Sequence, residues 1–330
     1  GAAIAAARSG ARVTLIEQGA MLGGMWTLGM LSPYFDNWNK QDLNLELKQK
    51  LQERGAWGGL WDNSFDHVAM AMLLDEYAVE HELDLMFCTM ATEPVMEGNT
   101  LRGVIAENKS GAQAVLADVV IDCTGDGDLA AMAGAPFEFG DEENLAQAAT
   151  LCSLWAGIDW NRKEIWKDGA ALEQAYRDGI FSVPDPGLPG ILHTVADSGW
   201  GNVGHIYGID ARDERTVTRG MVQGRKLALE YERYYRNYVP GCENARMLWT
   251  AQTLGIRESR RILGDYLLNV EDFVRQAVFD DEIGRYGYPI DLHGTRPPAD
   301  GKTDSGTALF ERYQYRNPGE SYGIPYRILL

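Results

Sequence analysis

The sequence lacks any long apolar run, and it is poor in basic residues. None of its 330 residues belongs to a stretch of the roughly 18 apolar residues that a membrane-spanning helix needs. Lys and Arg number 30 against 48 Asp and Glu, so the formal net charge is −18 at pH 7. Binding to nucleic acid or an anionic membrane needs a basic surface, so both partners are disfavoured. The length allows two domains or one large one.

Cysteine is sparse and its spacing excludes the common thiol sites. The four cysteines, at positions 88, 123, 152 and 242, form no Cys-x-x-Cys pair, which argues against a cysteine-based zinc site. We interpret them as reduced core or boundary thiols of a cytoplasmic protein. The five histidines show no His-Glu-x-x-His spacing, and no Gly-x-Ser-x-Gly elbow is present. The sequence therefore predicts neither a metal site nor a serine-hydrolase nucleophile.

The chain opens without an initiator Met and without the pattern of a signal peptide. Residues 1–8 are almost all small, which is typical of a helix already under way. Residues 324–330 end in what resembles a strand. We therefore expect this chain to be a piece of a longer protein.

The opening residues predict half of a dinucleotide-binding unit. After the Ala-rich helix, Gly10 is typical of a helix C-terminus. Residues 12–17 contain β-branched residues and alternate between polar and apolar side chains, which predicts a short strand that ends in Glu17. In a βαβ unit of this kind, an acid at the end of the second strand binds the ribose hydroxyls. The alternative is an unrelated α/β protein with an Ala-rich helix.

A glycine-dense loop, residues 22–29, follows Glu17 closely. Glycines let backbone N–H groups approach a ligand. The pattern Glu17-x(5)-Gly23-Gly24-Met25 resembles the FAD-dependent oxidoreductase family with a glutathione-reductase-type FAD domain. The resemblance implies that Glu17, the adjacent Gln18 and the Gly23–Met25 loop contact FAD, and that the phosphate-binding glycines would lie upstream of Gly1. A plain turn is the alternative for the loop.

Two later blocks carry the same resemblance. Residues 119–128 run as an apolar strand into Thr124-Gly125-Asp126, followed by a small-residue helix at 129–134, and they resemble the second flavin motif of that family. Residues 255–264 resemble its Gly-x-Arg-Glu-[Ser/Thr]-Arg-Arg segment. The matches span nearly the whole chain, although the first glycine loop and the C-terminal closing segment are not seen.

The resemblance implies an α/β fold: a glutathione-reductase-type, Rossmann-like FAD/NAD(P)-binding domain with a β-meander and an inserted α+β substrate domain. We expect the first part of the FAD domain at 1–136, a substrate or cap domain at 137–249, and a return to the FAD domain at 250–330. The resemblance also places Ala91, after a short strand, where backbone atoms touch adenine.

Local patterns predict the connecting elements. Amphipathic helices are expected at 42–54 and 66–83, and a long helix at 213–238 ends at a Pro-Gly pair. A short strand is expected at 85–89, and two strands at 101–107 and 112–117 flank a hairpin turn.

The candidate catalytic residues are Arg257, His205 and His293. If their segment is helical, Arg257, Arg260 and Arg261 share one face, where a guanidinium would bind a substrate carboxylate or stabilise reduced-flavin charge. Salt bridges to neighbouring acids are the alternative. His205 lies in a Gly-rich loop that we expect to be flexible.

Each of the two histidines, His205 and His293, would move protons while a flavin carries the hydride. A structural or exposed role is the alternative for each.

These observations predict an FAD-dependent oxidoreductase that transfers a hydride between flavin and a small polar substrate, a sugar or a hydroxy or keto acid. One alternative is a non-catalytic electron-transfer subunit acting with a redox partner protein, for which an acidic surface would suit a basic partner. Another is a nicotinamide dehydrogenase, against which the two glycine motifs argue. A homo-oligomer is also considered.

Overall fold

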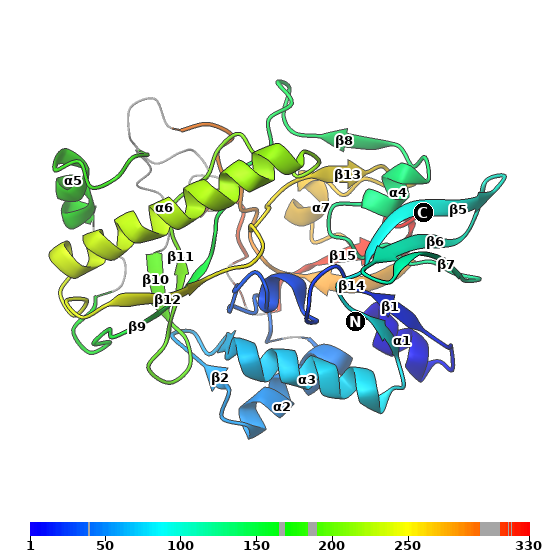
Figure 1. The fold of residues 1–330 in the computed structure, drawn as a ribbon, viewed down its shortest axis with the longest axis horizontal. Helices are drawn as coiled ribbons and strands as arrows, with labels where there is room; N and C mark the ends of the chain where they lie inside the picture. Colours follow the sequence, from blue (N-terminus) through cyan, green and yellow to red (C-terminus); the bar gives the residue numbers. More distant parts are fainter. Residues whose placement is uncertain (39, 165–168, 184–189, 298–310, 316, 318) are drawn as a thin grey trace. The chain divides into compact units, whose positions relative to one another are not determined.

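The computed structural model describes residues 1–330 except 39, 165–168, 184–189, 298–310, 316 and 318. The chain divides into two compact units, each described by itself. Unit 1 comprises Gly1–Leu28, His67–Glu138 and Arg260–Leu263, and unit 2 comprises Gly29–Asp66, Phe139–Ser259 and Gly264–Leu330. Both units mix helices with strands, so the fold is α/β, as predicted (Figure 1).

Unit 1 holds a parallel strand pair, a meander and a two-stranded sheet. Its helices are α1 (Ala2–Arg8), η1 (Gly24–Trp26, a 3₁₀ turn), α3 (His67–Glu80) and α4 (Asp128–Met132). Its strands are β1 (Thr14–Ile16), β4 (Asp84–Met86), β5 (Met90–Glu97), β6 (Thr100–Asn108), β7 (Gly111–Leu116), β8 (Phe137–Phe139, whose last residue is grouped with unit 2) and β13 (Arg260–Ile262).

The predicted opening of the chain is confirmed. The Ala-rich segment forms α1, which ends at Arg8 and is followed by Gly10 with a φ of 89°, a backbone conformation that glycine adopts without strain. The next strand, β1, pairs in parallel with β4, and α3 precedes β4 in the chain. Parallel neighbours need a long crossover connection, and the segment that contains α3 supplies it.

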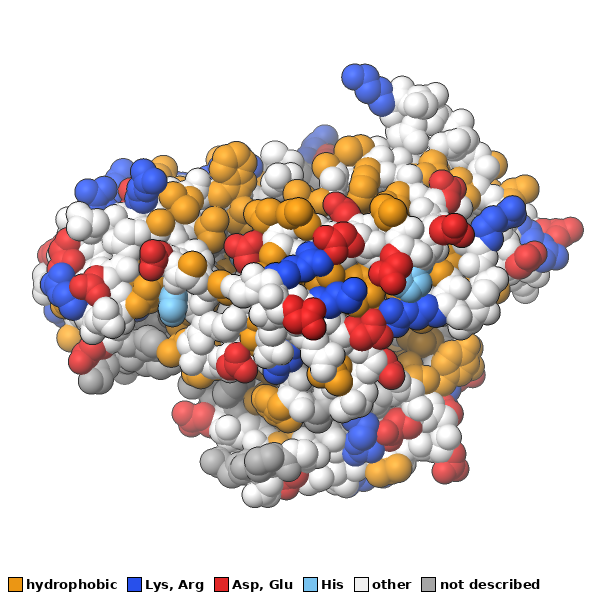
Figure 2. Space-filling model, turned by 90° about the horizontal axis from the view of Figure 1, so that it is seen from below, with side chains coloured by type: hydrophobic (Ala, Val, Ile, Leu, Met, Phe, Trp, Pro, Cys, Tyr) orange, Lys and Arg blue, Asp and Glu red, His pale blue; other side chains and the backbone are white. Residues whose placement is uncertain are grey.

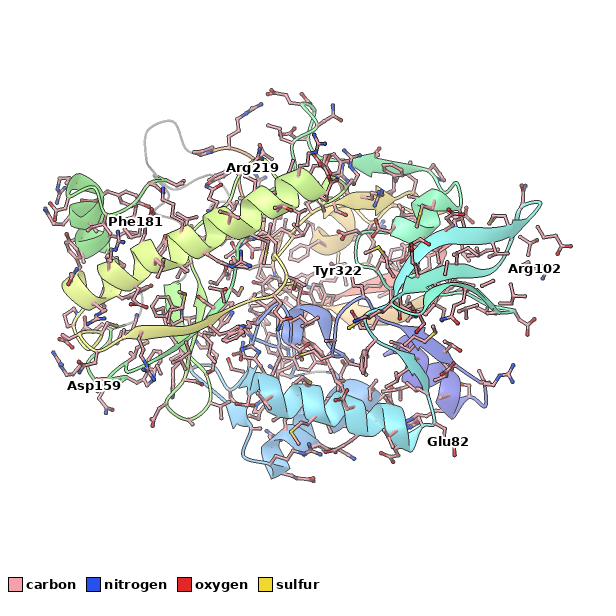
Figure 3. All side chains as sticks on the ribbon, in the orientation of Figure 1. Glu82, Arg102, Asp159, Phe181, Arg219 and Tyr322 are labelled. Carbon is pink, nitrogen blue, oxygen red and sulfur yellow. The ribbon has the colours of Figure 1, made fainter. Side chains whose placement is uncertain are left out.

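The predicted hairpin is confirmed as part of a three-stranded antiparallel meander, β5-β6-β7. Arg102, labelled in Figure 3, lies near the tip of the β5–β6 hairpin, where its Nε donates to Glu97 Oε2 over 2.8 Å. Helix α4 packs against β5. The meander therefore lies against the helix that follows the Thr124–Asp126 turn.

Two expectations for this region are wrong, and the condition for a shared arginine face is not met. Residues 119–123 form no strand, and Val119 and Ile121 are 76% and 58% exposed, because no neighbouring strand within the described residues pairs with them. Arg260 lies in a strand, so consecutive side chains alternate and the arginines do not share a helical face. Cys88 and Cys123 are exposed, whereas Cys152 and Cys242 are buried as expected.

Unit 2 contains an antiparallel sheet, a long helix and further strand pairs and turns around them. Its helices are α2 (Asp42–Glu53), α5 (Gly169–Arg177), α6 (Glu214–Tyr238), α7 (Val270–Val274) and η2 (Tyr326–Ile328). Its strands are β2 (Trp57–Gly58), β3 (Ser64–Phe65), β9 (Ser153–Ala156), β10 (Gly190–His193), β11 (Gly199–Asn202), β12 (Arg246–Thr250), β14 (Glu282–Tyr286) and β15 (Tyr322–Pro325). The strand expected at 324–330 thus ends at Pro325.

The predicted long helix is confirmed as α6, which lies along the four-stranded sheet β10-β11-β9-β12 (Figure 1). Asp213 caps it by accepting the N–H of Arg215. Gly224 allows close packing, because a Cβ there would come within 2.6 Å of Leu151. The buried face of α6 includes Leu227, Tyr231 and Tyr234, a spacing that repeats every three to four residues.

Phe181, labelled in Figure 3, packs on Tyr231 at 4.7 Å between ring centroids and extends this core. No helix among the described residues is long and apolar enough to cross a membrane. On the face shown in Figure 2, acidic and basic side chains are interspersed. The surplus of acidic residues is therefore not gathered into one patch on that face.

Candidate functional site

In unit 1, Glu17 directly follows β1 and is held at both backbone atoms. Its N–H donates to Met86 O over 3.0 Å, and its carbonyl accepts from Thr89 N over 3.1 Å. Its side-chain Oε1 accepts the N–H of Gly19 over 2.6 Å. The strand pairing therefore fixes where the carboxylate sits, and the turn after the strand fixes one of its oxygens. Gln18 between them is exposed.

The Gly23–Met25 segment is a tight turn built on two left-handed glycines. Gly23 has a φ of 109° and Gly24 a φ of 51°. Thr27 braces the turn, because its hydroxyl donates to Leu22 O over 2.7 Å. A Cβ on Gly23 would lie 2.7 Å from the Thr27 side chain, whereas a Cβ on Gly24 would meet nothing within 4 Å. The backbone of Gly24 thus borders open space, while Gly23 is needed for the turn itself.

Asp122 organises the second glycine turn. Its Oδ1 accepts from both the N–H and the hydroxyl of Thr124, over 2.9 and 2.8 Å, and its Oδ2 accepts from Ala130 N. Burial alone would raise the pKa of Asp122, but these hydrogen bonds outweigh burial and lower it. Gly125, with a φ of 84°, projects into open space.

Arg260 ties the third predicted motif to this turn. Its Nη1 donates to Asp126 O over 3.1 Å and to Asp128 Oδ1 over 2.5 Å. Arg261 forms a longer ion pair with Glu138, at 3.8 Å. The expected alternative, ion pairs with acids, therefore describes these two arginines, and Arg260 holds the turn from strand β13.

Ala91 lies in β5, where it pairs with Ala106 and begins a shift in register. It is two residues from Thr89, whose N–H binds the Glu17 carbonyl. Ala91 is therefore two residues from a hydrogen bond to Glu17 at the end of β1, and its strand contacts α4. Unit 1 thus supplies a strand-end carboxylate and two glycine turns that border open space. This set fits FAD, since a carboxylate can accept hydrogen bonds from the ribose hydroxyls and a glycine turn lets backbone N–H groups come close to a cofactor.

In unit 2 the segment at 148–151 brings distant residues together. Ala149 bridges to Ile206 and Thr150 bridges to Gly255, both antiparallel. The residues that neighbour these bridges, His205 and Arg257, therefore lie on either side of one central segment. His205 is 6% exposed, so the expectation of a flexible loop position is wrong: the bridge at the next residue fixes it.

His293 joins the same group from a later segment. Its N–H donates to Gln147 Oε1 over 2.7 Å, and the N–H of Ala148 donates to the carbonyl of Gly294 over 3.0 Å. The ring nitrogens His205 Nε2 and His293 Nδ1 lie 2.7 Å apart. One of them must carry the hydrogen and the other must accept it, so with this bond intact the two rings cannot both be fully protonated.

The arginine predicted from the third motif anchors the other side. Arg257 Nη1 donates to Ala148 O over 2.6 Å and to Thr150 Oγ1 over 2.9 Å. Both acceptors lie on the central segment. All three predicted catalytic residues, separated by up to 88 positions in the chain, are therefore collected by this segment.

A small pocket of about 250 Å³ opens beside these residues. It is lined by Gln147, Arg257, Tyr288, Pro289, Asp291 and His293. Among the described residues no group of three or more His, Cys, Asp or Glu side chains is placed to hold a metal ion. The pocket therefore presents charged and hydrogen-bonding side chains to a ligand.

The sequence patterns did not single out Asp291 and Tyr288 as functional residues. Asp291 Oδ1 lies 3.6 Å from His293 Nε2, and the Tyr288 hydroxyl donates to Asp291 Oδ2 over 3.4 Å. Interaction with His293 lowers the pKa of Asp291, against an opposing effect of burial, and Arg257 lowers it further. Burial, aided by Asp291, raises the pKa of Tyr288 above its usual range. The Asp-x-His spacing was the one signal that could have identified Asp291.

Comparison with known proteins gives a family. A family model described as FAD dependent oxidoreductase matches residues 1–330. No curated protein matches.

Solved structures are similar in part. L-proline dehydrogenase from P. horikoshii is 13% identical with a TM-score of 0.46, covering 80% of this chain and 78% of that one. A geranylgeranyl bacteriochlorophyll reductase-like protein from Thermoplasma acidophilum is 14% identical with a TM-score of 0.42, covering 77% and 62%. The myxobacterial chondrochloren halogenase CndH is 14% identical with a TM-score of 0.46, covering 78% and 60%. The chain thus spans about three fifths to four fifths of their lengths.

Proposed function

Since this chain belongs to the FAD-dependent oxidoreductase family, and is thus an enzyme whose cofactor is FAD, we propose that it transfers a hydride between the flavin and a small polar substrate. One observation carries the proposal. His205, His293 and Arg257, chosen separately as candidates for proton transfer and anion binding, gather in unit 2, and two of them line one pocket. Hydride transfer to or from a polar substrate needs a group that exchanges a proton and a group that binds the substrate. The histidine pair can do the first and the Arg257 guanidinium the second.

Unit 1 would hold the cofactor. In this proposal Glu17 accepts hydrogen bonds from the adenosine ribose, with Gln18 beside it. The turns at Gly23, Gly24 and Met25 and at Thr124, Gly125 and Asp126 border the cofactor through their backbone, as does Ala91. When bound, FAD supplies a two-electron acceptor or donor.

Unit 2 would hold the substrate and move its proton. Arg257 binds an anionic or strongly polar group, because a guanidinium is always charged and presents several N–H donors. His293 Nε2 faces Asp291 at 3.6 Å, which is longer than a hydrogen bond, so a ligand in the pocket can reach this nitrogen. The Asp291 carboxylate lies beside this nitrogen, and the hydrogen bond to His205 fixes the ring.

The finer organisation belongs to the same proposal. We infer a glutathione-reductase-type FAD domain at 1–136 and 250–330, with a substrate domain inserted at 137–249, in a cytoplasmic protein. These bounds differ from those of the two compact units, because residues 29–66, 250–259 and 264–330 belong to unit 2. A homo-oligomer or a redox partner would be compatible with this arrangement.

The test is anaerobic mixing of the FAD-loaded holoenzyme with small polar compounds, followed by the absorbance of the bound flavin. We expect at least one compound to bleach the flavin without any added protein. An Arg257→Lys variant, which keeps the charge but loses the planar fork, should need a higher substrate concentration for the same rate. An exposed Arg162→Lys variant serves as the matched control. Bleaching only in the presence of a redox partner would instead support the electron-transfer subunit.

A further inference from the structure

Helix α6 of unit 2 has an exposed face whose charge is opposite to that of the whole chain. Its other face, with Leu227 and Tyr231, is buried. The charged residues of the exposed face are one acid, Glu214, and otherwise only basic residues. These basic residues are Arg215, Arg219, Arg225, Lys226, Arg233 and Arg236, of which Figure 3 labels Arg219. Because the net charge of the chain is −18, this face is a basic stripe on an acidic protein.

The acids of α6 do not neutralise this stripe. Arg215, Lys226 and Arg236 pair with acids of the same helix at 3.6, 3.7 and 3.9 Å, which is longer than a hydrogen bond. Ion pairs between exposed groups contribute little free energy, so their cations can turn to another carboxylate at small cost. The stripe is therefore open to an acidic partner.

Apolar side chains lie within the stripe at helical spacing. Two helices that pair along their length present residues to each other at i, i+4, i+7 and i+11, which lie along one side of a helix. On the exposed face of α6, this spacing is followed by Val222, Lys226, Leu229 and Arg233. We call these four residues the basic seam.

Helix α3 of unit 1 exposes a seam with the same spacing and the opposite charge. This acidic seam consists of Val68, Met72, Asp75 and Val79. The helix contains no Lys or Arg, and its further acids Glu76 and Glu80 are exposed too. The apolar members of the two seams are between 49% and 75% exposed. Each seam thus leaves apolar surface in water, and covering that surface would be favourable.

The two seams complement each other, and this complementarity identifies the partner. One seam bears cations and the other a carboxylate, and both present apolar side chains at the same spacing. Every copy of the chain carries both seams, so a second copy supplies the complement to each. The net charge of −18 opposes this contact only weakly. The Debye length is about 8 Å at physiological salt, so the charges nearest the contact dominate.

We propose that the basic seam of one copy docks against the acidic seam of a second copy of this chain. Arg233 and its basic neighbours face Asp75 and its acidic neighbours. Val222 and Leu229 pack against the apolar side chains of the acidic seam. The inference goes beyond the proposed function and does not depend on it, because neither seam belongs to a candidate site.

Sedimentation velocity of the full chain tests the proposal at concentrations from about 1 to about 100 μM, a range that covers weak and moderate affinities. We expect the sedimentation coefficient of the wild type to rise with concentration. The α6 variant carries Arg225→Glu and Arg233→Glu, and the α3 variant carries Asp75→Lys and Glu80→Lys. In each variant the two seams bear like charges, so self-association should weaken about tenfold or more.

An exchange of charges separates a docking surface from a folding defect. In an equimolar mixture of the two variants, the acidic α6 of one faces the basic α3 of the other, and the remaining seams keep their wild-type charges. The mixture should therefore associate as the wild type does, and so should a single chain with all four substitutions.

The matched control combines Arg162→Glu with Arg177→Glu, which changes the net charge as the α6 variant does but at exposed residues outside both helices. It should associate as the wild type does, and a control as weak as the α6 variant would show that net charge decides. A wild type that stays monomeric up to about 100 μM would also overturn the proposal. So would variants that associate like the wild type, or a mixture that associates no better than either variant alone.

Discussion

The two candidate sites of this molecule differ in the groups that form them. In unit 1 the candidate cofactor residues are mainly backbone turns, in which Gly24 and Gly125 have positive φ and border open space, together with the strand-end carboxylate of Glu17. In unit 2 the candidate catalytic residues are side chains, of which His205 is buried, and they are linked by hydrogen bonds across distant segments. One site depends on chain conformation and the other on side-chain chemistry.

This difference teaches which substitutions should damage which property. A conservative exchange of the His293 side chain changes proton transfer but leaves the glycine turns of unit 1 as they are, so turnover should fall while cofactor content holds. A side chain added to a glycine in unit 1 changes the turn itself, so stability and cofactor binding should fall together.

The largest effect is expected at His293. His293→Gln removes the group that can exchange a proton with the substrate, and general acid–base catalysis contributes about 100- to 10,000-fold to a rate. We expect kcat/KM to fall within that range while the FAD content of the purified enzyme stays at the wild-type level. Steady-state kinetics and the flavin absorbance measure the two quantities.

His81→Gln is the matched control, because His81 lies beside Arg8 in unit 1 and lines no part of the pocket. It should leave kcat/KM unchanged. A His293→Gln enzyme as active as this control would show that His293 does not exchange a proton with the substrate.

A smaller effect is expected from alanine at the first glycine turn. Gly23→Ala should lower the free energy of unfolding by about 1–3 kcal/mol, because a side chain at its φ of 109° is strained and would meet Thr27. Gly24→Ala, in open space, should cost only about 1 kcal/mol. Urea unfolding of both variants measures the difference, and equal costs would show that the Thr27 contact does not matter.

Next comes the carboxylate of unit 1. Glu17→Gln removes the negative charge but keeps the size of the side chain, so we expect FAD to bind about tenfold more weakly. Fluorescence titration of the apoprotein with FAD measures the change. Glu53→Gln, at the end of α2 in unit 2, is the control. An unchanged FAD affinity for Glu17→Gln would move the ribose contact elsewhere.

The smallest effect concerns pH. The folded pKa of Asp122 is lowered, so its contribution to stability is present above the unfolded value near 3.8 and is lost as pH falls through the folded pKa. Asp122→Ala should therefore cost about 1 kcal/mol at pH 7, as expected for loss of the hydrogen bonds that its carboxylate accepts. That difference should shrink below pH ~4. A cost that stays constant down to pH ~2 would contradict the role of the ionised carboxylate.

Local patterns predicted the elements whose determinants are local. The Ala-rich α1, the capped α6 and the β6–β7 hairpin follow from periodicity, caps and turn glycines, and all three are confirmed. The strand expected at 119–123 is wrong because strand formation needs a pairing partner, which a sequence window does not contain. The helical face considered for the three arginines does not form, because Arg260 and Arg261 lie in a strand.

The candidate site was predictable residue by residue but not as an arrangement. Arg257, His205 and His293 stood out by residue type, yet nothing local showed that two bridges of the segment at 148–151 would collect them. Asp291 and Tyr288 went unrecognised because their importance comes from contacts within the folded pocket, of Asp291 with His293 and of Tyr288 with Asp291. The roles assigned to the nine cofactor residues of unit 1 stay predictions.

We expect His205 and His293 to act as one proton-transferring unit, and a double-mutant cycle distinguishes this from two independent histidines. The rate at which substrate bleaches the bound flavin is measured for wild type, His205→Gln, His293→Gln and the double variant. We expect the double variant to bleach its flavin almost as fast as His293→Gln alone, because both substitutions break the same unit. Fully additive losses, with each histidine contributing independently, would contradict it.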